Sequence, residues 1–188
     1  MKQLLKTTLL PYVLILLALP ASAALVDLLL HRLGLLWVGR WLGPVGTALL
    51  AISFLHSLRR RRLLRFGSAR QFLRLHEVLG WLGALVLLVH GGIHFNAVIP
   101  WLALVEMLIV VASGLTGKVL LQRARAGLET RRQELLAEGL PADEVEHRVM
   151  GMALVTGAMA HWRSIHMPVT MVFLALVLVH VATTLLFW

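Results

Sequence analysis

The stretch "RLHEVLGWLGALVLLVHGGIHFNAVIPW", from Arg74 to Trp101, decides the fold. Its apolar run is long enough to cross ~30 Å of hydrocarbon as a helix. The same stretch nevertheless contains three histidines, His76, His90 and His94. Ionisable side chains inside a membrane-spanning helix are costly and usually mark a functional site. The sequence therefore predicts a transmembrane helix whose imidazoles have a task.

The whole chain has the composition of a membrane protein. It has 188 residues, of which 59% are hydrophobic and only 14% are charged. A soluble domain of this size could not bury so many apolar side chains, and in lipid only helices or closed barrels satisfy the backbone. The apolar runs are continuous and rich in leucine instead of alternating, which favours helices.

Five apolar segments are long enough to span a bilayer. They predict an all-α integral membrane protein, a single domain over residues 1–188 in which five transmembrane helices form one bundle. The segments are about Thr7–Leu30, Trp41–Leu58, Leu75–Val98, Trp101–Leu121 and Ile165–Trp188.

The basic residues lie between these segments in the pattern that sets membrane topology. Of 18 Lys and Arg residues, two precede the first segment, seven lie in Arg59–Arg74 and seven in Lys118–Arg163. The positive-inside rule then places the N-terminus and both basic loops in the cytoplasm, and the C-terminus outside. This pattern accounts for the net charge of +9 without a nucleic-acid partner.

The first segment also has features of a secretory signal peptide. Lys2 and Lys6 precede an apolar run and "ALPASAAL", which would place a cleavage site after Ala23. The apolar run continues through Leu25–Leu30, however, so we expect a retained helix.

Residues 122–162 differ in kind and predict a cytoplasmic helical hairpin between the fourth and fifth helices. "QRARAGLETRRQELLAEG" is polar and favours a helix, Gly139 suits its C-terminal end, and Pro141 suits the start of the next helix. Two interpretations stay open, a solvated linker with an interfacial helix or a docking surface for a soluble partner.

Two pairs of histidines share one spacing. His76 and His90 are 14 residues apart, as are His166 and His180. In a helix, this spacing falls ~40° short of four turns and rises about 21 Å, so each pair lies on nearly one face. One segment separates the two helices in sequence, so they cross the membrane in the same direction. His76 and His166 then share the cytoplasmic level, and His90 and His180 share the outer level.

Two imidazoles at one level match the axial ligands of a haem iron. A structural zinc site would need four protein ligands. The chain has no cysteine, which excludes thiolate-held iron–sulfur clusters and haem attached through C-x-x-C-H. We therefore predict a column of two haems, while the spacing alone would also suit a dinuclear or transport metal site.

Residues beside the histidines could assist such a site. Gly80 and Gly83 could let a flat cofactor approach the helix, or could serve tight helix packing. Arg74 and Arg163 could bind haem propionates, or could simply be positive-inside flanks. His94 could replace His90 as the outer ligand or bind a propionate.

Other polar residues leave their roles open. The carboxylates of Asp27 and Glu106 could serve a quinone or a proton path, or could form hydrogen bonds between helices. "SGLTG" at Ser113–Gly117 indicates close packing.

The remaining histidines are ambiguous. His31 lies near the outer end of the first segment and His56 near the inner end of the second, His161 points to a different face from His166, and His147 lies in the hairpin, where we expect it to be solvated.

At the matched histidines the chain resembles b-type cytochromes of the ferric-reductase-like and related bacterial dihaem families. The resemblance rests on "RLHEVLG…LVH" (Arg74–His90) and "WRSIHMPVT…LVH" (Trp162–His180), and covers roughly residue 72 to the C-terminus. Members hold two haems b between histidine-bearing helices and pass electrons across the membrane. The resemblance implies a multi-pass protein of the bacterial plasma membrane. It also implies four axial ligands, which are His76, His90, His166 and His180.

One departure from these families affects the expected partners. Ferric reductases and NADPH oxidases continue into a flavin- and nicotinamide-binding domain, whereas no G-x-G-x-x-G fingerprint follows a predicted strand here. We expect an electron-transfer subunit of a respiratory or reductase complex that takes electrons from quinol, a soluble protein or another subunit. The alternatives are a haem-free transporter or channel subunit whose histidines bind metal or relay protons, and a membrane anchor.

Overall fold

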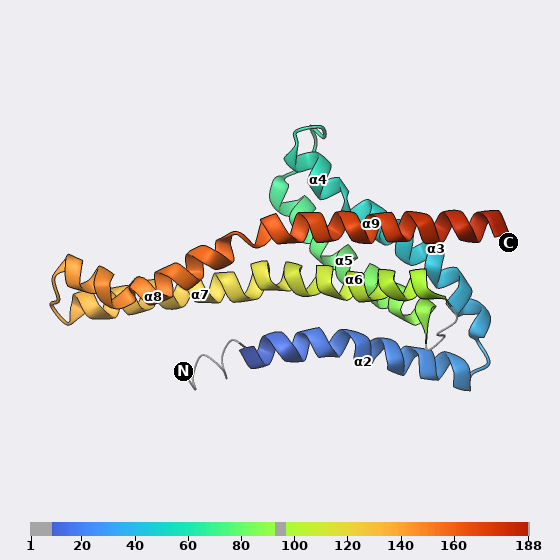
Figure 1. Cartoon of the computed structure of the whole chain (residues 1–188), viewed down its shortest axis with the longest axis horizontal. Helices are drawn as coiled ribbons and strands as arrows, with labels where there is room; N and C mark the ends of the chain where they lie inside the picture. The colour runs from blue at the N-terminus through green and yellow to red at the C-terminus, as the bar shows by residue number, and fades with distance from the viewer. Residues whose placement is uncertain (1–8, 93–96, 188) are drawn as a thin grey trace.

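The computed structural model describes residues 9–92 and 97–187, without the side chain of Arg163. His94 and Trp188 therefore lie outside the described residues. Within the described part every regular element is helical (Figure 1). The elements are α2 (Leu10–Arg32), α3 (Leu36–Ser53), α4 (Leu55–Arg60), α5 (Ala69–Gly91), α6 (Val98–Leu115), the π-helical turn η2 (Thr116–Leu120), α7 (Leu121–Ala137), α8 (Ala142–Ala160) and α9 (Trp162–Phe187).

Five helical stretches are long and apolar enough to cross a membrane. The prediction of an all-helical chain with five such segments is confirmed, and the chain has the character of a multi-pass membrane protein. The stretches are Leu10–Arg32, Leu36–Arg60, Ala69–Gly91, Val98–Ala137 and Ala142–Phe187.

Some helices begin or end at other residues than the predicted apolar segments do, because local hydrogen bonds set those helix ends. The third segment was expected to begin at Leu75, but α5 begins at Ala69. Ser68 accepts a hydrogen bond from the Gln71 N–H at 3.2 Å, and the Ser68 N–H donates to Oε1 of Gln71 at 2.9 Å. This capping box starts the helix in a polar stretch that hydropathy does not detect. The second predicted segment is interrupted at Phe54, between α3 and α4.

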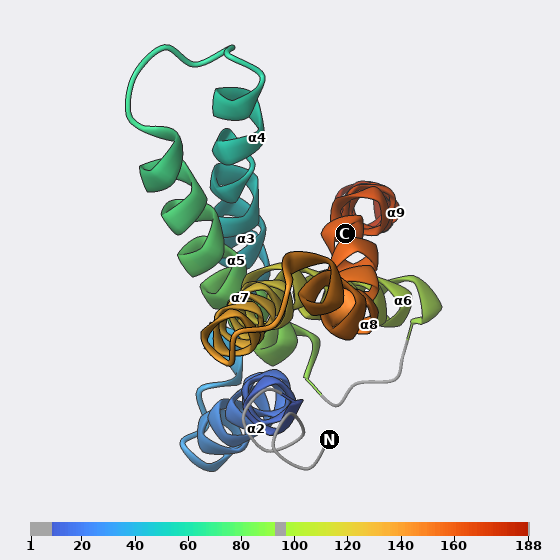
Figure 2. The ribbon, with the colours of Figure 1, turned by 90° about the vertical axis from the view of Figure 1, so that its left-hand side faces the viewer.

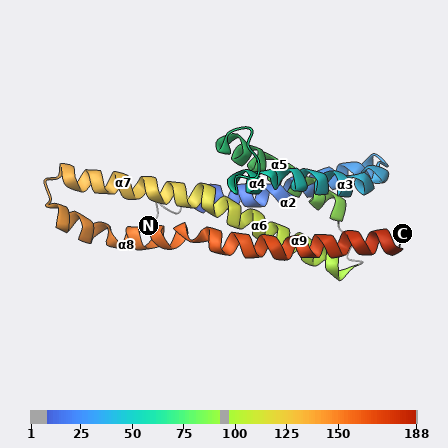
Figure 3. The same ribbon diagram turned by 90° about the horizontal axis from the view of Figure 1, so that it is seen from above.

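The helices follow two directions. Helices α2, α6, α7, α8 and α9 run along the long axis of the molecule, while α3–α4 and α5 form an arm that lies across it (Figures 1 and 2). The start of α2 and the turn between α7 and α8 point toward one end. The C-terminus and the turn between α2 and α3 lie toward the other end (Figures 1 and 3).

Each histidine-bearing helix has its own main neighbour. Helix α5 packs chiefly on α3, and α9 packs chiefly on α6. Four buried residues from four helices form the central core, namely Leu19, Ala84, Met107 and Phe173. Helices α7 and α8 pack around a second core of Leu135, Val145 and Val149. Gly139, with φ of +81°, takes the left-handed conformation just after α7 ends.

Glycines bring α3 and α5 close together. A Cβ added to Gly46 would lie 2.7 Å from Cγ of Leu87, and one added to Gly83 would lie 2.8 Å from Cδ2 of Leu50. The absence of side chains at these two positions therefore sets the separation of the two helices.

We expect Gly46→Ala to weaken this contact and destabilise the protein. Overpacking of a tight contact costs about 1–3 kcal/mol, against a gain of up to ~1 kcal/mol in helix propensity. Gly39→Ala, in the same helix, is the matched control because no atom lies within 4 Å of its added Cβ. Thermal unfolding in detergent should show a lower midpoint for Gly46→Ala and an unchanged or higher midpoint for Gly39→Ala.

Candidate functional site

The four matched histidines lie at two levels on α5 and α9, and all four side chains are half-buried. His166 interacts electrostatically with His76, and His180 interacts electrostatically with His90. The earlier histidine of α5 thus lies on the side of the earlier one of α9, and the later on the side of the later. The two helices therefore point in the same general sense and not in opposite ones, although α5 is inclined to α9 (Figure 1). We call the His76–His166 pair the inner level and the His90–His180 pair the outer level.

The ring of His90 is held by helix α3. Its Nδ1 lies 2.8 Å from the carbonyl oxygen of Gly39. A Cβ added to Gly43 would lie 2.7, 2.7 and 3.0 Å from Cε1, Nε2 and Cδ2 of the ring. These nearly equal distances mean that the face of the ring covers Gly43. A carbonyl can only accept, so Nδ1 donates, and Nε2 of the neutral ring keeps its lone pair.

The ring of His76 is held where helix α3 gives way to α4. Its Nδ1 lies 3.3 Å from the carbonyl oxygen of Ser53. At this junction the Ser57 N–H bonds the Phe54 carbonyl at 2.9 Å, and the Ser53 carbonyl is turned toward His76. The ring of His56 stacks on His76 with centroids 5.5 Å apart and planes 27° apart. The interruption between α3 and α4 therefore supplies a second acceptor for an imidazole of α5.

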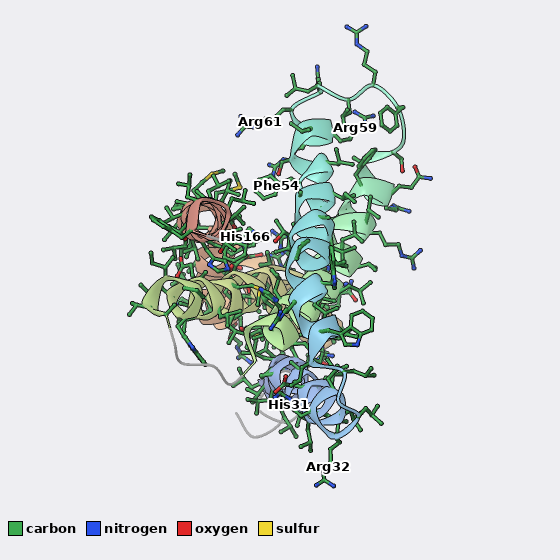
Figure 4. The ribbon with its side chains drawn as sticks, turned by 90° about the vertical axis from the view of Figure 1, so that its right-hand side faces the viewer. His31, Arg32, Phe54, Arg59, Arg61 and His166 are labelled. Carbon is green, nitrogen blue, oxygen red and sulfur yellow. The ribbon has the colours of Figure 1, made fainter. Side chains whose placement is uncertain are left out.

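The ring of His166 is held by helix α6. Its Nδ1 lies 2.6 Å from Oγ of Ser113. The Ser113 hydroxyl also lies 2.8 Å from the Val110 carbonyl, and when it donates there its Oγ accepts from the Nδ1–H of His166. Figure 4 labels His166 beside α6. The indole of Trp162 lies beside the ring, with centroids 5.2 Å apart. Gly117 leaves room for that indole because an added Cβ would clash with it. The predicted close packing at "SGLTG" is confirmed.

Both histidines of α9 carry the same backbone support. The hydroxyl of Thr170 donates to the His166 carbonyl at 2.7 Å, and that of Thr184 donates to the His180 carbonyl at 2.8 Å. Each threonine lies four residues after its histidine, a position from which hydroxyls bond the preceding helical turn. Thr170 and Thr184 are therefore 14 residues apart, like the two histidines that they support.

The space between the two levels is apolar. Phe173 lies seven residues from both His166 and His180, and Ala84 lies between the two histidines of α5. Both belong to the central core, where Ala84 is fully buried and Phe173 is 8% exposed. A packed layer of this kind excludes water between the two levels.

The two glycines of α5 have different surroundings. Gly83 packs against Leu50 and the Gly46 carbonyl of α3. Of the two roles that the sequence left open for it, Gly83 therefore has that of tight helix packing. Gly80 has open space where its side chain would be. Only Gly80 therefore offers the free approach to the backbone that a flat cofactor needs.

The predicted charged and outer residues are placed in part. The side chain of Arg74 is exposed on α5, two residues before His76. His94 and the side chain of Arg163 lie outside the described residues, so their predicted roles stay predictions. An ion pair between Lys118 and Glu77, 2.6 Å long, joins η2 to α5 next to His76.

The carboxylate of Asp27 pairs within its own helix. Asp27 is 8% exposed, and His31 bonds its carbonyl oxygen at 2.8 Å with its carboxylate 3.5 Å away. Figure 4 labels His31 beside Arg32 at the end of α2. Glu106 is half-buried on α6.

Sequence reasoning missed the groups that hold the rings. The carbonyls of Gly39 and Ser53 have no signature in hydropathy or spacing, since any residue supplies a carbonyl. Gly39 and Gly43 do form a small-x-x-x-small pattern, which signals close helix approach and could have indicated α3 as the partner of α5.

Comparison of the chain with protein-family models, curated proteins and solved structures gives no match.

We expect His76 and His90 to be protonated on Nδ1 when neutral, since both donate from Nδ1 to carbonyl oxygens. Nitrogen NMR of histidine-labelled protein at about pH 9, well above the usual imidazole pKa of about 6.5, reports the tautomer directly. The exposed His147 serves as the reference. Protonation on Nε2 of His76 and His90 would contradict the hydrogen bonding described here.

Proposed function

We propose that the chain is an integral membrane cytochrome that holds two haems b and relays electrons across the bilayer. The observation that carries the proposal is the state of the imidazoles. In His76 and His90 the Nδ1–H of the neutral ring is engaged by a carbonyl oxygen and Nε2 keeps its lone pair, and in His166 the Nδ1 has Ser113 as its hydrogen-bond partner. When bound, each haem would supply a one-electron change of its iron.

The donor set fits haem. Metal-ligating histidines almost always donate their other N–H in a hydrogen bond to a carbonyl, carboxylate or water. This bond fixes the orientation of the ring and makes its free nitrogen a stronger electron-pair donor to the metal. Here two backbone carbonyls and a serine oxygen do so from helices α3 and α6. His31 and His161 also bond a carbonyl through Nδ1, but that carbonyl is one turn back in their own helix, whereas the partners of the matched histidines come from other helices.

The pairing of levels supports two haems instead of one. His76 with His166 would hold the inner haem, and His90 with His180 would hold the outer haem. Gly80 would let a porphyrin approach α5, and Arg74 and Arg163 would bind propionates. The apolar layer around Phe173 would keep water away from the path between the levels and lower the local dielectric.

The proposed setting is the plasma membrane of a bacterium, with the N-terminus in the cytoplasm and the C-terminus outside. This orientation follows from the basic residues between the spans. The α7–α8 pair would then lie on the cytoplasmic side as a hairpin, available to a redox partner or another subunit of the complex. The donor would be quinol, a soluble protein or a partner subunit.

We expect the purified chain to bind two haems and to give the sharp reduced-minus-oxidised difference spectrum of paired imidazoles. His76→Ala and His166→Ala should each lose the inner haem, and His90→Ala and His180→Ala should each lose the outer one. Haem per chain is measured by extraction and absorbance, beside circular dichroism to confirm folding.

The matched controls are His147→Ala and His161→Ala, whose side chains are exposed. Both should keep two haems. A folded wild-type protein with no haem would contradict the proposal and favour a transporter or an anchor. Loss of the outer haem in His94→Ala but not in His90→Ala would move the outer ligand to His94.

We expect Ser113→Ala to weaken the inner site without emptying the outer one. Ser113 is a positioning residue, and loss of such a partner typically costs 10–100-fold in metal affinity. Because a bonded Nδ1–H makes His166 a stronger donor to oxidised iron, its loss should also raise the midpoint potential of the inner haem. Redox titration measures that potential.

Two further variants separate positioning from stability. Ser113→Thr keeps the hydroxyl and should restore the wild-type potential. Ser164→Ala, two residues before His166 and exposed, should change neither level. An unchanged inner potential in Ser113→Ala would show that the hydrogen bond does not tune the ligand.

A further inference from the structure

The loop between α4 and α5 concentrates positive charge. Arg59, Arg60, Arg61, Arg62 and Arg65 lie within seven consecutive residues, and no acidic residue occurs between Asp27 and Glu77. All but Arg59 have exposed side chains. Figure 4 shows Arg59 inside the loop and Arg61 pointing away from it. The charges of this loop are therefore turned outward with no carboxylate of its own to neutralise them.

The same loop exposes two large apolar side chains. Leu63 is 67% exposed and Phe66 is 65% exposed. The ring of Phe66 rests its edge on Phe72, with centroids 5.7 Å apart, which leaves most of its surface uncovered. Apolar groups next to arginines are costly in water but fit an interface where headgroups meet acyl chains.

The loop has a defined shape. The Nε–H of Arg59 donates to the Gly67 carbonyl at 3.0 Å and closes the loop on itself. Arg62 has a φ of +61° and Gly67 a φ of +71°, and these left-handed residues turn the chain at both sides of the apolar pair. Ser68 and Gln71 then fix the start of α5 through the capping box. The arginines and apolar groups are thus presented together by a closed turn.

The position of the loop indicates what covers it. It joins two candidate membrane spans, Leu36–Arg60 and Ala69–Gly91, and so lies directly at the edge of the bilayer. Arginine binds phosphate oxygens bidentately and is weakly hydrated, which suits a phosphate at a membrane surface. The positive charge and the exposed apolar side chains of the loop are together complementary to one kind of molecule, an anionic phospholipid, which has a negative headgroup and apolar acyl chains.

We infer that the loop formed by residues 59–67 is a binding site for anionic phospholipid. The exposed arginines hold the phosphate-bearing headgroup, and Leu63 and Phe66 enter the acyl region beside it. The site is separate from both histidine levels, and its existence does not depend on the proposed haems. It would fix the depth of α4 and α5 in the membrane.

The test uses the full chain in a neutral detergent, with dioctanoyl phosphatidylglycerol and dioctanoyl phosphatidylcholine as probes. Native mass spectrometry counts the bound lipid. Phosphatidylglycerol should bind on the order of several hundredfold more tightly, since each of the four exposed arginines contributes about fivefold. The preference should shrink with added salt.

Two triple variants with the same loss of charge locate the site. Arg60→Gln, Arg61→Gln and Arg65→Gln together should lower the affinity for phosphatidylglycerol on the order of a hundredfold. The matched control replaces three exposed arginines of the α7–α8 pair, Arg125, Arg131 and Arg148, with Gln and should leave it unchanged. Leu63→Ser with Phe66→Ser should weaken binding of both lipids. Circular dichroism confirms that each variant keeps its helices.

Each contrary outcome overturns the inference. Equal binding of the two lipids, or an equal loss in the control triple, would reduce the effect to general charge attraction. Competition by glycerol phosphate or inorganic phosphate at the concentration of the lipid would identify a free-phosphate site. Binding of polyglutamate without any preference for phosphatidylglycerol would assign the loop to an acidic protein partner.

Discussion

The close contact between α3 and α5 is the feature on which the rest of the structure depends. Gly43 and Gly46 have no side chains, so the two helices approach until the ring of His90 covers Gly43. At that separation a backbone carbonyl of α3 reaches the ring nitrogen of a residue on α5. Because a carbonyl accepts and never donates, the contact also decides which nitrogen carries the proton. One packing feature thus sets the helix position and the chemistry of the imidazole together.

The second histidine helix is held by different means. Helix α9 rests on α6, where Ser113 bonds the ring of His166 and Gly117 makes room for Trp162. The two helices share the central layer of Ala84 and Phe173 but take their ring supports from separate neighbours. The ring supports of His76 and His90 therefore come from α3, and that of His166 comes from α6. The proposed function builds on this division, because a cofactor between α5 and α9 would need rings that are held from other helices.

The sequence predicted the coarse architecture because hydropathy is a sum over many residues and tolerates local error. All five membrane-length helices were found in this way, and the turn at Gly139 was predicted separately, from the preference for glycine just after a helix. Boundaries set by single hydrogen bonds were not, as at Ser68, where a capping box extends α5 into a polar stretch. The ring supports were also missed, since Gly39 and His90 are 51 residues apart and Ser113 and His166 are 53 apart. Contacts at that separation depend on how helices pack, which a periodic pattern does not specify.

The two levels are not equivalent, and this bears on what a relay can do. The inner level has the ring of His56 beside His76, the indole of Trp162 beside His166, and the ion pair of Lys118 with Glu77 nearby. At the outer level, the contacts of His90 within the described residues include the Gly39 carbonyl and the bare backbone of Gly43. A backbone carbonyl and a serine hydroxyl accept with different strength, so imidazoles bonded to them donate differently to a metal. Two identical sites would pass an electron equally well in both directions. Sites with different hydrogen-bond partners, polarity and nearby charge have different potentials, and that difference would give the proposed column a preferred direction.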